Sequence, residues 1–186
     1  MRDIEQTNEV LFGQQNFVSR AEKLEYIVVS STLSPVYVKS LRTLIPSHIK
    51  LVDAPMSGAA IAAREQRLSF MLGGSTTDLD ALQPLFEAMG KSFHRMGAFG
   101  AGMTAKVLNN LLAASSTAMT RLVLDWADDL GLDEKKLLAL VEKSSGQTWL
   151  ASGFNDMDFA RDGYSLDNTI GILEKEKHLG CLLMKF

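Results

Sequence analysis

The chain has 186 residues, of which 46% are hydrophobic and 22% charged, and its formal net charge is −3. This composition is typical of a soluble globular protein with one ordinary domain or two small ones. The negative charge argues against nucleic acid as a partner, because no basic excess is present to neutralise phosphates. A single cysteine rules out an internal disulfide framework, and three scattered histidines show no zinc-ligand spacing, so no metal site is expected.

The amino-terminal stretch MRDIEQTNEVLFG has no apolar core of the kind found in signal peptides. The sequence also has no run of about 18 apolar residues, the length that a membrane-spanning helix needs. We therefore expect no membrane partner and a location in the cytoplasm or in an organelle matrix.

Residues 1–98 predict alternating helices and strands. Residues 7–20 are weakly helical and broken by Gly13, and helices are expected at 32–45, with Ser34 and Pro35 at the start, and at 75–89. Apolar or β-branched runs predict strands at 26–31, 49–55, 68–74 and 91–97. This order implies an α/β layer with a largely parallel sheet.

From Gly102 to Leu130 the sequence predicts one long helix rich in Ala, Leu and Met, which ends at Gly131. Asp133 is placed to cap a second helix over 134–144. Residues 145–168 show no clear helical pattern, and residues 169–186 are again predicted to be helical. We therefore predict a partial Rossmann-like α/β layer over 1–98, followed by an all-α domain over 99–186 that is built on one long helix.

The start of the long helix carries three polar residues, Lys106, Asn109 and Asn110, close together. Positions three and four apart share one helix face, so these side chains can converge on a ligand. The nearby Gly100 and Gly102 would let the backbone approach an anion at the helix start. A lysine there can exchange a proton with a substrate hydroxyl. The alternative is a solvated lysine with asparagines that cap or bridge helices.

Two further segments follow predicted strands. Ser57 and Gly58 lie beyond the strand that stops at Pro55, which places a hydroxyl and bare N–H groups on a loop at the carboxyl edge where sheets bind ligands. The alternative is a tight turn that needs small residues. Thr32 follows the preceding strand, and it either faces a ligand or simply begins a helix.

Four motifs occur in compact order: SSTLSP, LVDAPMSGAAIAA…LSFMLGG, GAGMTAKVLNN and LGL…SSGQTW. Together they resemble the β-hydroxyacid dehydrogenase family, which includes 3-hydroxyisobutyrate dehydrogenase, tartronate semialdehyde reductase and, more distantly, 6-phosphogluconate dehydrogenase. The resemblance covers nearly the whole chain. It implies an NAD(P)-dependent oxidoreductase that oxidises a small 3-hydroxy acid by hydride transfer, with NAD or NADP as cofactor.

The resemblance also implies roles for single residues. Lys106 matches the family's catalytic lysine, and Asn110 matches the asparagine that holds the substrate, with Asn109 beside it. Ser57 and Gly58 match the loop for the substrate carboxylate, and we expect Lys106 and Asn110 to face this loop across one cleft between the two parts of the chain. Two further positions match cofactor-binding residues: Thr32 and, within LEKEKHLG, Lys175, for which Lys177 is the alternative.

The sequence departs from the family above all in the cofactor domain, because these 186 residues contain no Gly-x-Gly-x-x-Gly turn to hold the pyrophosphate. We read the chain as starting at the second half of the cofactor domain, and we expect NAD(P) binding by this chain alone to be weak and its activity to be impaired. A non-catalytic binding or oligomerisation module is the alternative function. The apolar long helix and the sheet edge left by the missing strands predict a homo-oligomer.

Overall fold

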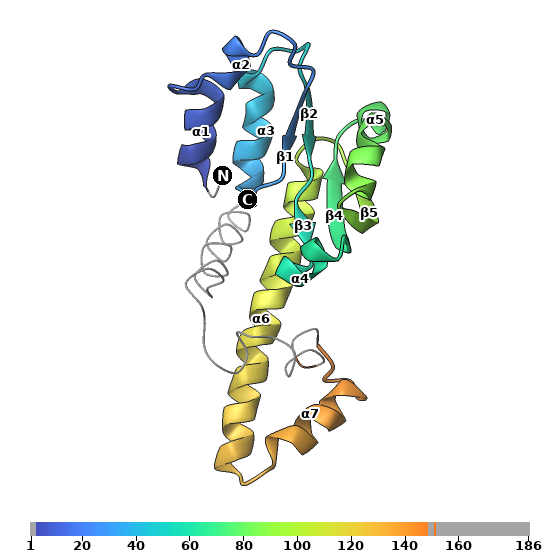
Figure 1. Cartoon of the computed structure of the whole chain (residues 1–186). Coiled ribbons are helices and arrows are strands. Elements are labelled where there is room, and N and C mark those ends of the chain that lie inside the picture. Colours follow the sequence, from blue (N-terminus) through green and yellow to red (C-terminus); the bar gives the residue numbers. More distant parts are fainter. Residues whose placement is uncertain (1–2, 149–150, 152–186) are drawn as a thin grey trace. The chain divides into compact units, whose positions relative to one another are not determined.

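The computed structural model describes residues 3–148 and 151, and the chain divides into two compact units, Met1–Val107 and Leu108–Phe186. The first unit alternates helices and strands as the sequence predicts (Figure 1). Its elements are α1 (Ile4–Phe12), α2 (Phe17–Arg20), β1 (Tyr26–Val29), α3 (Pro35–Leu44), β2 (Lys50–Asp53), β3 (Met56–Ser57), α4 (Ala59–Arg64), β4 (Leu68–Gly73), α5 (Thr76–Glu87), β5 (Gly90–Gly97) and the start of α6 (Ala101–Asp129).

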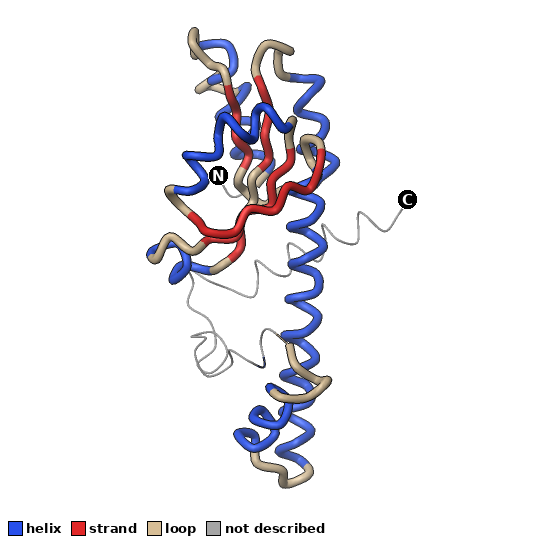
Figure 2. Tube along the Cα trace, turned by 90° about the vertical axis from the view of Figure 1, so that its right-hand side faces the viewer, coloured by secondary structure: helices blue, strands red, loops and turns tan. Residues whose placement is uncertain are grey.

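The five strands form one sheet, seen as the red segments of Figure 2. β1 pairs with β2 and β4 pairs with β5 in parallel, whereas β4 is antiparallel to both β2 and β3. β2 and β3 run along the same side of β4 in one register, from the pair Asp53–Gly73 to the pair Ser57–Ser69. The pairing with β4 is interrupted between β2 and β3 at Pro55, which has no N–H to donate to the strand ladder.

The expectation of a largely parallel sheet is therefore wrong for the middle of the layer, which is mixed. Residues 58–67 connect β3 to β4, and this connection, with only the short α4 in it, is shorter than the roughly twelve residues that a parallel crossover needs. The chain accordingly turns back beside the strand it has just left. The short β3 and α4 were not predicted from the sequence.

Alternation along the strands builds a core on each face of the sheet. Leu51 of β2 packs into a cluster with α1 and α3, and its neighbour Val52 packs into a second cluster with α5. In the second cluster Phe70 lies 5.4 Å from Phe86 and 6.2 Å from Phe93, measured between ring centroids. Met103, from the first turn of α6, is fully buried in the first cluster.

The second unit consists, in its described part, of the rest of α6, helix α7 (Glu134–Glu142) and a short following segment. The chain leaves α6 through Gly131 at φ +71°, and Asp133 caps α7 by accepting a hydrogen bond from the N–H of Lys136. An α/β part followed by one long helix is thus confirmed. None of the helices in the described ranges is both long and apolar enough to cross a membrane.

Candidate active site

The three polar residues on α6 differ in burial. Lys106 is half-buried, Asn109 is exposed, and Asn110 retains only 7% of its surface accessible. Lys106 and Asn110 are one helical turn apart and so share a face of α6, and Asn109, three residues from Lys106, lies at the edge of that face. Lys106 belongs to the first compact unit and Asn110 to the second, and the predicted cleft that joins them to Ser57 and Gly58 stays a prediction.

Ser57 is the last residue of β3 and not part of a free loop as the sequence suggested, whereas Gly58 lies in the bend between β3 and α4. Ser57 is half-buried and paired with Ser69 of β4, and Gly58 is exposed immediately before α4. Gly58 has φ +134°, and a Cβ at this position would lie 2.6 Å from the Cβ of Ala62. Glycine is therefore required here by the backbone, which leaves the N–H groups beside Ser57 uncovered by a side chain.

Thr32 lies in the segment between β1 and α3, beyond the carboxyl end of β1, and is half-buried. The N–H of the next residue, Leu33, donates a hydrogen bond to the sulfur of Met103 at 3.3 Å. The segment of Thr32 is thereby attached to the first turn of α6, three residues before Lys106.

The expected anion site at the start of α6 is occupied by a side chain of the protein itself. The carboxylate of Asp53 accepts hydrogen bonds from the N–H of Gly100 at 2.6 Å and from the N–H of Met103 at 2.5 Å. The glycines there serve packing rather than ligand approach. A Cβ on Gly100 would lie 2.6 Å from Cγ of Lys39, and one on Gly102 would lie 2.2 Å from the carbonyl oxygen of Met71.

Asp53 is the residue near this site that sequence reasoning missed. It is fully buried at the end of β2, and burial raises the pKa of its carboxyl, while the bonds from Gly100 and Met103 and the charge of Lys39 act to lower that pKa. The signal was present in the motif LVDAP, because an acidic residue at the end of a buried apolar strand needs hydrogen-bond donors.

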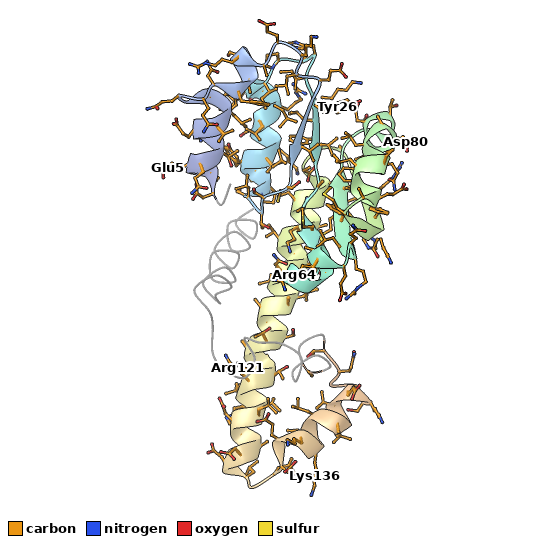
Figure 3. The ribbon with its side chains drawn as sticks, in the orientation of Figure 1. Glu5, Tyr26, Arg64, Asp80, Arg121 and Lys136 are labelled. Carbon is orange, nitrogen blue, oxygen red and sulfur yellow. The ribbon has the colours of Figure 1, made fainter. Side chains whose placement is uncertain are left out.

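Other features of the described residues contribute no further group to this candidate site. A depression lined by α1 residues, among them Glu5 and Asn8, contains none of the predicted site residues (Glu5 is labelled in Figure 3). In residues 3–148 and 151, no group of three or more His, Cys, Asp or Glu side chains is arranged to hold a metal ion. Lys175 and Lys177 lie outside the described residues, so the choice between them stays a prediction.

Two family models match this chain. Residues 1–100 match the NAD binding domain of 6-phosphogluconate dehydrogenase, and residues 100–173 match the NAD-binding domain of NADP-dependent 3-hydroxyisobutyrate dehydrogenase. The solved structure of Mycobacterium tuberculosis 3-hydroxyisobutyrate dehydrogenase with L-serine shares the fold. Its TM-score is 0.85 at 24% identity, over 98% of this chain and 64% of that chain.

The curated relatives point to the same family. The mitochondrial 3-hydroxyisobutyrate dehydrogenase of Bos taurus is 34% identical over 83% of this chain and 46% of its own length. The 2-hydroxy-3-oxopropionate reductase of Escherichia coli is 36% identical over 70% of this chain and 45% of its own length. The chain thus spans about half the length of these relatives. Because the first family model alone covers more than half of the residues, the chain belongs to the β-hydroxyacid dehydrogenase family.

Proposed function

We propose that this chain supplies the substrate-binding and catalytic residues of an NAD(P)-dependent dehydrogenase that oxidises a small 3-hydroxy acid. Family membership supports the reaction type, and the names of the relatives, 3-hydroxyisobutyrate dehydrogenase and 2-hydroxy-3-oxopropionate reductase, support a small hydroxy acid as substrate. NAD and NADP are both retained as cofactors, because both occur in the descriptions of the matching families.

The observation that carries this proposal is the first turn of α6. Its residue Met103 is bonded through its N–H to Asp53, at the end of β2, and through its sulfur to Leu33, next to Thr32. The strand that precedes the predicted substrate residues Ser57 and Gly58, and the segment of Thr32, are thus attached to the same helical turn, and Lys106 follows it directly. A dehydrogenase needs its substrate segment, its cofactor segment and its proton-transfer group fixed on one framework.

The proposed roles follow from the chemistry of each group. The amino group of Lys106 would exchange a proton with the substrate hydroxyl while Asn110 and, beside it, Asn109 hold that oxygen. The hydroxyl of Ser57 and the uncovered backbone at Gly58 would bind the substrate carboxylate. Thr32 would contact the dinucleotide from beyond the end of β1, and Lys175 would do so from a later segment. When bound, the nicotinamide supplies the hydride acceptor.

The test is the replacement of Lys106 by Met, which keeps the length of the side chain and removes the amine. We expect turnover of 3-hydroxyisobutyrate, followed by the absorbance of the reduced nicotinamide with each dinucleotide, to fall by about a hundredfold or more. The matched control is Lys135→Met, which removes an exposed lysine of α7. Equal and measurable turnover by wild type and Lys106→Met would remove the catalytic assignment.

A non-catalytic binding or oligomerisation module is the second candidate, and one observation favours it: these 186 residues contain no Gly-x-Gly-x-x-Gly turn. Without that turn and its helix N-terminus, we expect weak or undetectable binding of NAD(P) by these residues alone. Titration calorimetry would contradict this expectation if either dinucleotide bound with a micromolar dissociation constant. Wild-type turnover of any small 3-hydroxy acid would exclude the non-catalytic reading.

We also propose a homo-oligomer built on α6. Leu112, Met119 and Trp126 of this helix are 55–73% exposed, and an apolar helix surface of this kind needs a covering partner. Light scattering at micromolar concentration should give a mass of at least two chains, and a single-chain mass near 20.4 kDa would overturn this.

Two broader assignments remain proposals. The first treats residues 1–98 as part of an NAD(P)-binding domain and 99–186 as a helical domain. A segment of residues 99–186 that gives an unfolded circular dichroism spectrum on its own would count against that division.

The second assignment places the protein in the cytoplasm or an organelle matrix, the latter supported by the mitochondrial relative. Cell fractionation that finds the protein with the membrane or secreted fractions would refute it.

A further inference from the structure

We propose that Asp53 is the positioning residue for Lys106: its buried carboxyl group fixes the first turn of α6 and thereby sets the orientation of the candidate catalytic amine. This inference rests on the proposed function, because only there does the orientation of Lys106 matter for turnover. Asp53 itself has no role toward substrate or cofactor in this proposal.

The hydrogen bonds of Asp53 define the position of the helix start in space. One carboxylate oxygen accepts from the N–H of Gly100, and the other accepts from the N–H of Met103. The first four N–H groups of a helix have no partner within it, so a carboxylate that binds two N–H groups at this end fixes both its place and its rotation. Asp53 is fully buried, so water does not compete for these bonds.

Glycine residues provide the space in which Asp53, strand β4 and the start of α6 come together. Gly73 of β4 lies opposite Asp53 in the sheet, and a Cβ there would lie 2.1 Å from Oδ1 of Asp53 and 2.8 Å from the nitrogen of Gly102. A Cβ on Gly102 would lie 2.2 Å from the carbonyl oxygen of Met71. Gly73 and Gly102 therefore let the carboxyl group, the strand and the helix come together with no intervening side chain.

The position of Met103 determines that of Lys106 through the geometry of the helix. Lys106 follows Met103 by three residues, which is a rise of about 4.5 Å and nearly one full turn. A rotation or shift of the first turn is transmitted to Lys106 almost unchanged, because no loop intervenes. Met103 is in addition buried and bonded to Leu33, so the carboxyl group acts on a turn that already packs against the core.

The test compares Asp53→Asn with Asp133→Asn. In Asp53→Asn the size is kept, but the amide NH2 faces one of the two N–H donors, so one bond is lost. Asp133 caps α7 through a single side-chain bond at the surface and is distant in sequence from the site residues, which makes Asp133→Asn the control for the same substitution at a helix start away from the site. Circular dichroism and thermal unfolding are recorded for each variant to establish that it is folded.

Two readouts separate positioning from a merely structural role. We expect kcat of Asp53→Asn to fall by about tenfold to a hundredfold with KM for the hydroxy acid within about threefold, because the carboxylate-binding segment is untouched. We also expect the labelling rate of the Lys106 amine by acetic anhydride, measured by mass spectrometry, to change by about threefold or more. The rate at the exposed Lys135 of α7 serves as the internal reference.

Each outcome decides the inference. An unchanged kcat together with an unchanged Lys106 labelling rate in folded Asp53→Asn overturns it, as does an equal effect of Asp133→Asn. If Asp53→Asn does not fold, Gly102→Ala, which displaces the helix start while Asp53 is retained, must reproduce both effects. If the wild type shows no turnover, the proposed function fails, and the labelling rate of Lys106 alone confirms or refutes the positioning by Asp53.

Discussion

The two units of the chain differ in how much apolar surface their described residues bury. The first unit has a cluster on each face of its sheet, and side chains such as Val38, Val52 and Phe70 are fully buried. The described part of the second unit has one small cluster, formed by Leu124, Leu138 and Ala151. Burial of apolar area is the main stabilising term, so the first unit is held by its own core and suits a rigid framework for site residues.

The largest expected effect is that of Phe70→Ala. Phe70 is fully buried between α5 and the sheet, in contact with two other aromatic rings, so its removal leaves a cavity that the neighbours cannot close. We expect the free energy of unfolding to fall by about 3–5 kcal/mol, measured by urea denaturation followed by circular dichroism. Phe17→Ala is the control, because Phe17 is 45% exposed.

Leu138→Ala applies the same test to the second unit. Leu138 is buried in the small cluster, where few described side chains surround it, so the site can relax more fully. We expect a loss near the lower end of the usual range, about 2 kcal/mol. A loss as large as that of Phe70→Ala would show that the two units are equally well packed and would break the comparison.

The next effect concerns Gly73, where the first unit has no space for a side chain. A Cβ at Gly73 would lie 2.1 Å from a carboxylate oxygen of Asp53, so we expect Gly73→Ala to destabilise the protein by about 2–4 kcal/mol. In the second unit Gly146 is the matched control, since its nearest contact would be 3.7 Å away and Gly146→Ala should change stability by less than about 0.5 kcal/mol. Urea unfolding of both variants checks the difference.

Local signals in the sequence were sufficient for most elements. Pro35 after Ser34, the apolar run of β1, Gly131 and Asp133 are each properties of a few adjacent residues, and the elements that they predicted are present. The short β3 and α4 have too few residues to show a periodicity, so they could not be predicted.

The role of the helix start depends on residues that are distant in sequence. The glycines at 100 and 102 were interpreted as space for a ligand, because the sequence does not show that Asp53 fills the helix end. Strand direction was missed for the same reason, since it depends on which strand β4 meets after the turn. The predicted convergence of Lys106 with Ser57 depends on such long-range geometry as well.

The buried carboxyl group of the first unit predicts a pH effect. Burial raises the pKa of Asp53 above its ordinary value of 3.8, so the folded state binds the proton more tightly than the unfolded chain does. The stability contributed by Asp53 is therefore full below that value and is lost as the pH rises through the folded pKa.

The measurement is the difference in free energy of unfolding between wild type and Asp53→Asn, in which the other carboxylates cancel. We expect this difference to fall with rising pH above about pH 4, by at most about 1.4 kcal/mol per pH unit. A difference that grows with pH would mean that the two N–H bonds and Lys39 stabilise the carboxylate by more than its burial costs.

The smallest expected effect is at the cap of α7, where the second unit has its counterpart to Asp53. Asp133 accepts a hydrogen bond from the N–H of Lys136 at 2.9 Å, but it lies at the surface, where water can replace the bond. We expect Asp133→Ala to cost about 1 kcal/mol, and Asp133→Asn to cost less because asparagine caps helices equally well. Amide exchange of residues 134–142 should accelerate in Asp133→Ala and leave the first unit unchanged. If Asp133→Ala destabilised the protein as much as Gly73→Ala, the exposed cap of α7 would stabilise the second unit as much as the buried start of α6 stabilises the first unit. The proposed difference between the exposed cap at Asp133 and the buried carboxyl group of Asp53 would then be wrong.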